Sequence, residues 1–192
     1  MPHGRTSVDD ERVTELALAA GKGDRVALEA WVRATQADVW RFVAHLSTAA
    51  AADDLTQETY VRAFGSLARF AARSSSRTWL LSIARRVVVD QVRAAASRPR
   101  VADHVDWLVA AEERDVRENR GAPSFEDRIE IGLLLAQLDY DRREALVLTQ
   151  VLGLAYADVA DICGCPVGTV RSRVARARDD LLRAREDHDN AM

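Results

Sequence analysis

The sequence is poor in residues that mark several common protein classes. Only two of its 192 residues are cysteines and only four are prolines. Cys163 and Cys165 stand one residue apart, too close for an ordinary disulfide and too few for a four-thiolate zinc site, so we expect them to be structural. No apolar run approaches the roughly 18 residues that span a bilayer, and the N-terminus lacks the apolar stretch of a signal peptide. We therefore expect a soluble, cytoplasmic protein.

Groupings of catalytic residues are also lacking. The four histidines are scattered over the terminus, a helix, the central segment and the tail: His3, His45, His104 and His188. No Ser/His/Asp grouping, Walker loop or metal-ligand spacing occurs, and the adjacent acids Asp53 and Asp54 point to different faces of a helix. We expect a chain that is not an enzyme and that needs no metal and no cofactor.

Lysine is almost absent, and positive charge is concentrated in parts of the chain. Of the 27 basic residues only Lys22 is a lysine, and all others are arginines. The guanidinium group of arginine can form paired hydrogen bonds with phosphates and with the edge of guanine. The net charge of −3 hides a segregation: residues 69–100 carry eight arginines and one acid, whereas residues 101–130 carry four arginines and nine acids. Because salt screens exposed charges beyond about 8–10 Å, such patches act locally, and a negative total does not exclude nucleic-acid binding.

Periodicity predicts an all-α protein with two small helical domains. No long alternating strand pattern appears, and helices are expected near residues 9–21, 24–47, 53–67, 76–95, 125–137, 141–152, 156–163 and 167–183. The acidic segment 97–124 is bracketed by prolines and is expected to be a flexible linker. It would join a domain at residues 1–96 to a second domain at 125–185, with a disordered tail at 186–192.

The stretch "CGCPVGTVRSRVARAR" (163–178) predicts the turn and second helix of a helix-turn-helix. Gly164 ends the first helix, and Pro166 suits the first turn of the second. An apolar stripe is expected to face inward, formed by Val167, Val170, Val174, Ala177 and Leu181. The opposite face, which carries arginines, fits a major groove, with further arginines on its flanks where phosphates would lie. The alternative is a solvated arginine face on a bundle helix; the turn residues and the regular stripe favour nucleic-acid binding.

Three stretches in this order resemble the extracytoplasmic-function, or group 4, sigma factors of bacterial RNA polymerase. "LGLAYADVADICGCPVGTVRSRVARAR" (152–178) resembles their region 4, which reads the promoter −35 element. "ADDLTQETYVRAF" (52–64) resembles their region 2 polymerase-binding helix, and "RTWLLSIARRVVVDQVR" (77–93) resembles their −10 helix. The resemblance implies a factor that binds core RNA polymerase, directs promoter-specific initiation and assists melting of the −10 element.

The resemblance also implies roles for individual residues. The −35 element would be bound by Thr169, Arg171, Ser172, Arg173, Arg176 and Arg178. The −10 loop captures a base flipped from the non-template strand, and the basic helix after it holds the strand; the corresponding residues are Phe70, Arg73, Ser74, Ser75, Arg77, Arg85, Arg86 and Arg93. The clamp helices of the polymerase β′ subunit would contact Asp54, Gln57, Glu58 and Arg62. The β flap and an anti-sigma factor are further partners in the family. The linker of these proteins threads toward the active-site cleft; the alternative for residues 97–124 is a tether that serves only as a spacer.

Several expectations and alternatives accompany this assignment. On the helix from Asp53 an inward face is expected, formed by Leu55, Thr59, Ala63, Phe64 and Leu67. Composition alone favours a plain solvated face for its outer strip, and only the resemblance indicates a partner there. Trp79 is expected to pack in the core. The chain departs from the family pattern at Ser76, where an aromatic is frequent, and at Arg86, where asparagine is common. Two other functions stay open: a self-sufficient dimeric helix-turn-helix regulator, and a helical adaptor without a role on DNA.

Overall fold

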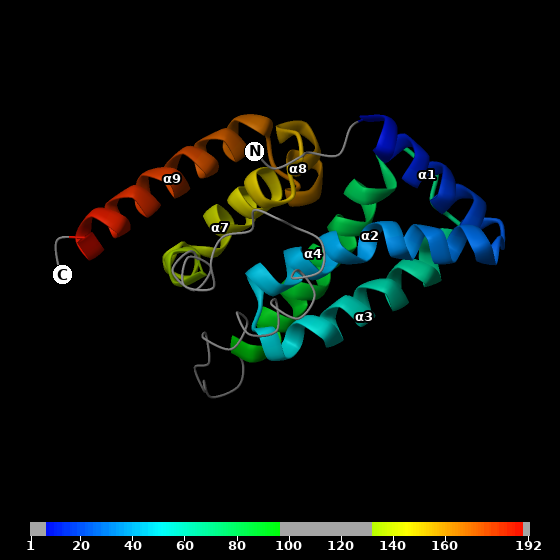
Figure 1. The fold of residues 1–192 in the computed structure, drawn as a ribbon, viewed down its shortest axis with the longest axis horizontal. Coiled ribbons are helices and arrows are strands. Elements are labelled where there is room, and N and C mark those ends of the chain that lie inside the picture. Colours follow the sequence, from blue (N-terminus) through cyan, green and yellow to red (C-terminus); the bar gives the residue numbers. More distant parts are fainter. Residues whose placement is uncertain (1–6, 97–131, 190–192) are drawn as a thin grey trace.

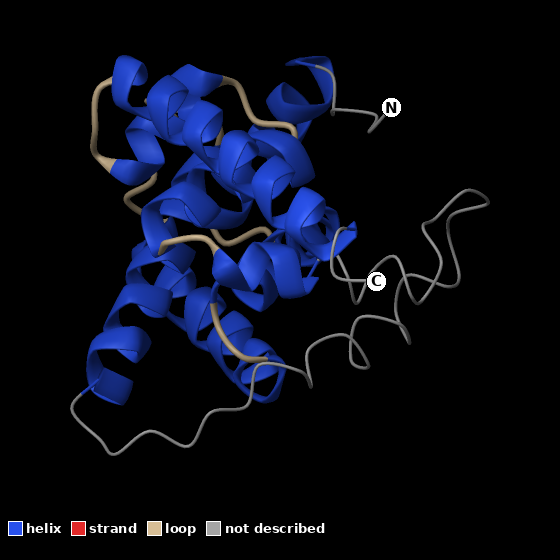
Figure 2. Ribbon diagram, turned by 90° about the vertical axis from the view of Figure 1, so that its left-hand side faces the viewer, coloured by secondary structure: helices blue, strands red, loops and turns tan. Residues whose placement is uncertain are grey.

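A computed structural model describes residues 7–96 and 132–189, and every element in these ranges is a helix (Figure 2). The elements are α1 (Ser7–Gly21), α2 (Arg25–Leu46), α3 (Ala49–Leu67), α4 (Ser76–Ala96), α7 (Tyr140–Leu146), the π-helical η1 (Val147–Val151), α8 (Tyr156–Cys163) and α9 (Val167–Asp189). None of these helices is both long and apolar enough to cross a membrane. The all-α fold class predicted from periodicity is confirmed for this part of the chain.

The first domain consists of α1 to α4 packed around large apolar side chains. Helix α2 starts where the Asp24 carboxylate accepts the N–H groups of Val26 and Ala27, at 2.9 and 3.0 Å, as an N-cap does. Its inner face buries Trp31 and Phe42 completely. Leu80, Leu81 and Val88 of α4 are equally buried, so α4 is a central helix of this domain.

The second domain consists of α7, η1, α8 and α9. The Asp139 carboxylate caps α7 by accepting the Arg142 N–H at 3.0 Å. The sequence predicts one continuous helix over 141–152, but after Leu146 the chain widens into a π-helical turn, in which the Leu152 N–H donates to the Val147 carbonyl at 3.0 Å. This turn directs the Leu152 carbonyl toward the first domain.

The two domains pack against each other rather than standing apart. Helix α8 lies against α4, and α2 meets α7 and η1, so that the apolar core runs from one domain into the other. Figure 1 shows α7 and α8 seated beside α2 and α4, whereas α9 projects away from the first domain toward the C-terminus. The predicted linker at 97–124 lies outside the described residues, as do residues 125–131.

Most helices begin and end within two residues of the predicted positions, and two helix ends differ by more. Helix α3 begins at Ala49, ahead of the predicted start at residue 53, because the alanines before Asp53 are good helix formers. Helix α9 continues to Asp189, past residue 186 where a disordered tail is predicted. The segment "LLRARED" contains no glycine or proline that would end the helix earlier. Residues 132–137 are helical and form the described end of the helix predicted over 125–137.

Candidate nucleic-acid and polymerase interfaces

The helix-turn-helix is built as the sequence predicts. Helix α8 ends at Cys163, and Gly164 follows in the left-handed region at φ 64°, which glycine adopts without the strain that a Cβ atom would bring. The N–H of Cys165 donates to the Ala160 carbonyl at 3.1 Å and closes the turn. On α9 the predicted inward stripe is confirmed, because Val170, Val174 and Ala177 are buried against α7 and α8.

The face of α9 that points away from this core is polar and accessible. Arg171, Ser172 and Arg176 are exposed, and Thr169 is half-buried at the start of the helix. The Ser172 hydroxyl donates to the Thr169 carbonyl at 2.9 Å. Neither Arg171 nor Arg176 forms an ion pair with any described residue. Two exposed guanidinium groups therefore flank the outer face of a helix that can approach a groove of DNA.

The two flanking arginines of α9 are held by the protein itself. Arg173 is ion-paired with Asp141 of α7 and also donates to the Cys165 sulfur at 3.7 Å. Arg178 donates to the Gln150 side-chain oxygen in η1 at 2.8 Å. These contacts fasten α9 to the preceding helices. The phosphate contacts predicted for both arginines stay a prediction, and they would require each guanidinium to share or exchange its present partner.

The predicted polymerase-binding strip lies on the outer face of α3. Asp54 and Gln57 are exposed, and Glu58 is half-buried. Arg62 donates to Glu58 at 2.7 Å and to Asp90 of α4 at 2.8 Å. The strip thus has exposed polar side chains in the first half of α3 and an ion-paired arginine about two turns later.

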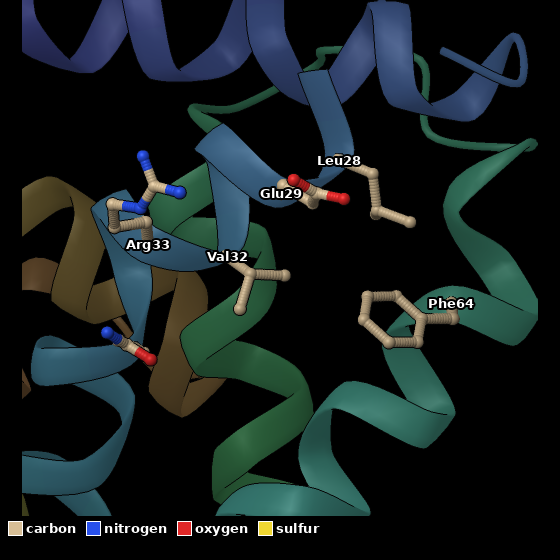
Figure 3. A pocket seen from close by; sticks show the side chains of 6 residues that line it. Leu28, Glu29, Val32, Arg33 and Phe64 are labelled. Carbon is tan, nitrogen blue, oxygen red and sulfur yellow. The ribbon is translucent and has the colours of Figure 1, made fainter. Parts of the chain in front are cut away.

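Phe64 was predicted to face inward, and this prediction is wrong: the residue is 45% exposed. The ring contacts Tyr60 at a centroid distance of 5.8 Å and lines a shallow groove of about 390 Å³ between α2 and α3, opposite Leu28 and Val32 (Figure 3). The other four residues of the predicted inward face, Leu55, Thr59, Ala63 and Leu67, are buried, so only Phe64, at the edge of this stripe, lies outside the core.

The −10 loop is predicted over residues 70–77; in the structure α4 already begins at Ser76, so that residues 70–75 form the loop that leads into it. Phe70 packs its ring on Trp79 at a centroid distance of 4.9 Å, and Trp79 packs in turn on buried Trp31, which agrees with the expected core role of Trp79. Arg73 is exposed, and the Ser74 hydroxyl donates to the Ser75 carbonyl at 3.4 Å. The loop is therefore accessible at Arg73 and anchored at its start.

Ser75 has a structural task that the sequence analysis did not assign. Its hydroxyl oxygen accepts the Thr78 N–H at 3.1 Å, which is the N-cap contact of α4, and it lies 2.9 Å from the Thr78 hydroxyl. The Thr78 hydroxyl donates to the Asp158 carboxylate of α8 at 3.3 Å. Because a carboxylate only accepts, the Ser75 hydroxyl donates to Thr78, and the chain of bonds links the loop to the second domain.

Two arginines predicted to hold the −10 strand lie in the contact between the domains. Arg77 is 5% exposed; it donates to Asp38 of α2 and to the Leu152 carbonyl of the second domain, both at 2.7 Å. Arg85 donates to Glu144 of α7 at 2.8 Å. Arg86 and Arg93 of α4 are exposed. In this arrangement Arg86 and Arg93 are accessible, Arg77 is not, and Arg85 is engaged by a carboxylate.

Glu144 is the centre of a buried polar cluster. Its side chain has no exposed surface, and besides Arg85 it accepts the Tyr140 hydroxyl at 3.4 Å and the Cys163 thiol at 3.4 Å. Burial, together with the neighbouring carboxylate, raises the pKa of Cys163, so the thiol keeps its proton and donates. Both cysteines are free, and the cluster gives Cys163 the structural role that the sequence predicts.

The acceptors of this interface were missed by the sequence analysis. Glu144 begins the stretch "EALVL", in which the other residues are apolar. An acid beside apolar residues in a predicted helix indicates a buried charge that needs a basic partner, and this is how the sequence could have revealed it. Asp38 and Asp158 carry no comparable signal, because each stands on a half-exposed helical face. Among the described residues no group of three or more His, Cys, Asp or Glu side chains is placed to hold a metal ion.

His45 supplies a pH-dependent contribution to stability. It lies in the last turn of α2, and burial, reinforced by the nearby Arg41 and Arg143, lowers its pKa from 6.5 to about 4. Unfolding therefore takes up a proton between these pH values, and the free energy of unfolding falls as the pH drops from 6.5 to 4, by up to about 3 kcal/mol. Denaturant titrations across this range measure the slope. His45→Gln lacks this component, and an equal slope in that variant would contradict the assignment.

Comparisons with known proteins match both domains. A family model described as "Sigma-70 region 2" matches residues 31–98, and one described as "Sigma-70, region 4" matches residues 128–181. The "ECF RNA polymerase sigma factor SigC" of Mycobacterium tuberculosis is 58% identical over 184 residues, covering 96% of this chain and 97% of the relative. The "RNA polymerase sigma-H factor" of Pseudomonas aeruginosa is 31% identical over 186 residues, covering 91% and 94%.

Solved structures share the fold. The sigma factor RpoE in complex with the anti-sigma factor NepR from Bartonella quintana aligns with a TM-score of 0.65 at 28% identity, covering 81% of this chain and 94% of that chain. CnrH in complex with the cytosolic domain of CnrY aligns with a TM-score of 0.64 at 25% identity, covering 91% and 97%. The region 2 match decides against a self-sufficient helix-turn-helix regulator and against an adaptor without a role on DNA. The chain belongs to the extracytoplasmic-function sigma factors, which direct core RNA polymerase to promoters.

Proposed function

We propose that the chain divides promoter recognition among three surfaces. The outer face of α9 reads the −35 duplex through Arg171, Ser172 and Arg176. The loop 70–75 and the exposed arginines of α4 bind the separated −10 strand. The outer strip of α3, with Asp54 and Gln57, binds the β′ clamp helices of core polymerase. We place this activity in the cytoplasm, with all catalysis supplied by the polymerase.

The observation that carries this proposal is that the accessible polar faces lie apart, on different helices of the chain. Arg171 and Arg176 lie on a helix that projects from the second domain, whereas Asp54 and Gln57 lie on α3 of the first domain (Figure 1). Each face is held by buried apolar side chains behind it. DNA and polymerase can therefore bind the same chain at once without competing for one surface.

We further propose that the packed arrangement is the free form of the factor. Glu144 and the Leu152 carbonyl occupy the guanidinium groups of Arg85 and Arg77, which the −10 strand needs. Acceptor groups of the second domain thus occupy the guanidinium groups that DNA phosphates would bind. Binding of core polymerase to the exposed strip on α3 would be followed by separation of the domains and release of α4.

The solved relative from Bartonella quintana is in complex with an anti-sigma factor, and we include such a protein among the partners of this chain. The support is the shared fold, with at least 25% identity over most of both chains. A pull-down with the full chain as bait, competed by core polymerase, would test whether the two partners exclude each other.

A pair of single substitutions tests the division of labour. Arg176→Ala is expected to relax −35 sequence preference and to cost about 1–3 kcal/mol of duplex affinity, because a bidentate base contact is lost, while core polymerase affinity is unchanged. Gln57→Ala is expected to lower the affinity for core polymerase and to leave the affinity for the −35 duplex unchanged. Both properties are measured by fluorescence anisotropy with labelled −35 duplexes and by titration with core polymerase. A variant that weakens both bindings equally would contradict separate surfaces.

A further inference from the structure

Helix α1 contacts both ends of the −10 loop. Its Thr14 reaches the first residue of α4, after the loop, and its Gly21 reaches the last residue of α3, before the loop. The region 2 family model matches residues 31–98 and so leaves α1 out. A helix outside the recognised family region therefore touches the two points that fix the path of the loop.

The downstream end of the loop is fixed at Ser76, which has no exposed surface. Its backbone N–H donates to the Thr14 hydroxyl at 2.9 Å, and that hydroxyl donates to the Asp10 carbonyl at 2.7 Å. The Ser76 hydroxyl accepts the indole N–H of Trp31 at 3.2 Å. The first N–H group of a helix has no acceptor within that helix. For α4 the acceptor is the Thr14 hydroxyl of α1.

The upstream end is fixed by close contact between backbones. A Cβ atom at Gly21 would lie 2.7 Å from the Leu67 carbonyl oxygen, so only glycine lets α1 approach this closely. The same carbonyl accepts the N–H of Phe70, the first residue of the loop, at 3.0 Å. The position of α1 is thereby coupled to the point where the chain leaves α3.

The loop between these points is held in an unfavourable backbone conformation. Ala72 has φ 50°, in the left-handed region, where a residue with a Cβ atom is strained. Such a conformation persists only when its surroundings fix it. The two anchors on α1 provide that constraint, and exposed Arg73 follows directly in the chain.

We propose that α1 is a positioning element for −10 recognition, with Thr14 and Gly21 as its positioning residues. Neither touches DNA; they set the loop that presents Arg73 and Ser74 to the displaced strand. The inference rests on the proposed role of this loop in binding the −10 element. A substitution at either anchor is therefore expected to reduce discrimination between −10 sequences, while recognition of the −35 element and binding of core polymerase are unchanged.

The first test removes the hydroxyl of Thr14. Run-off transcription is measured with the full chain, core polymerase and promoters that share one −35 element and differ by single bases in the −10 element. Thr14→Val is expected to lower the ratio of transcripts from the best and the substituted promoters about five-fold, the effect of one lost hydrogen bond. Thr14→Ser is expected to restore it. Thr56→Val is the matched control, because Thr56 also bonds the carbonyl four residues earlier but does not touch the loop.

The second test changes no polar group. Gly21→Ala forces α1 away from Leu67 and is expected to reduce the ratio by a similar factor of about five. Gly65→Ala is its control, since a Cβ atom there meets nothing within 4 Å. A ratio taken within one preparation does not depend on the fraction of folded protein, so a loss of stability cannot imitate the result.

The outcomes separate this inference from the proposed function of the loop. If Arg73→Ala lowers the ratio but Thr14→Val and Gly21→Ala match their controls, the role of α1 is wrong and the role of the loop stands. If Arg73→Ala also leaves the ratio unchanged, both are wrong. An equal loss of −35 discrimination in Thr14→Val would show a general structural effect and overturn the inference as well.

Discussion

Arg77→Ala is expected to lower the free energy of unfolding by about 3–5 kcal/mol, because removing one member of a buried ion pair leaves the other charge in place. The Arg77 and Asp38 side chains are 6% and 13% exposed, and their atoms lie 2.7 Å apart. The Leu152 carbonyl loses its donor in the same substitution. Urea denaturation followed by circular dichroism measures the loss.

Two controls make this result specific. Arg73→Ala removes an exposed arginine four residues earlier and is expected to change stability by no more than about 0.5 kcal/mol. The double variant Arg77→Met, Asp38→Leu replaces both charges by apolar groups and is expected to recover most of the loss. If Arg77→Ala is as stable as Arg73→Ala, the ion pair is not structural and Arg77 is available to the −10 strand.

Glu144→Gln is expected to raise the affinity of the free chain for single-stranded DNA about ten-fold. Glutamine keeps the size of the side chain but not its charge, so the bond to Arg85 weakens from a charged to a neutral one. In the proposed mechanism the domains must separate before Arg77 and Arg85 can bind the strand, so the apparent dissociation constant is expected to fall as the separated fraction rises. Anisotropy with a short random-sequence oligonucleotide, without polymerase, measures the change.

The matched control for this prediction is Glu29→Gln, the same chemical change at an exposed position of α2 that is not in the domain contact. It is expected to leave the affinity unchanged. With core polymerase present, Glu144→Gln and the unmodified chain are expected to bind the strand equally, since the domains are already apart. Equal affinities of Glu144→Gln and Glu29→Gln without polymerase would contradict the occlusion of α4.

The helix-turn-helix could be predicted closely because its signals are local. Gly164 supplies the left-handed turn, and the spacing of Val170, Val174 and Ala177 fixes which face of α9 is buried. The exposure of Arg171 and Arg176 follows directly from that spacing. Here a few neighbouring residues determine both the local structure and the face that it presents.

The domain contact could not be predicted because its partners are far apart in the sequence. Arg77 and Leu152 are separated by 75 positions, and Arg85 and Glu144 by 59. A basic helical face is typical both of a DNA contact and of a protein contact, and composition does not distinguish them. Phe64 was placed wrongly for a similar reason: a helical stripe predicts the centre of the buried face, but neighbouring helices decide how wide that face is, and Phe64 lies at its edge.

The distance between the domains in the free chain and in the holoenzyme tests the central claim most directly. Spin labels at Gly65→Cys on α3 and Leu182→Cys on α9, in a Cys165→Ser background that leaves buried Cys163, report this distance by pulsed electron resonance. The account predicts one narrow distribution in the free chain, replaced by a longer distance when core RNA polymerase is added. A broad distribution in the free chain, or the same distance in both states, would contradict it.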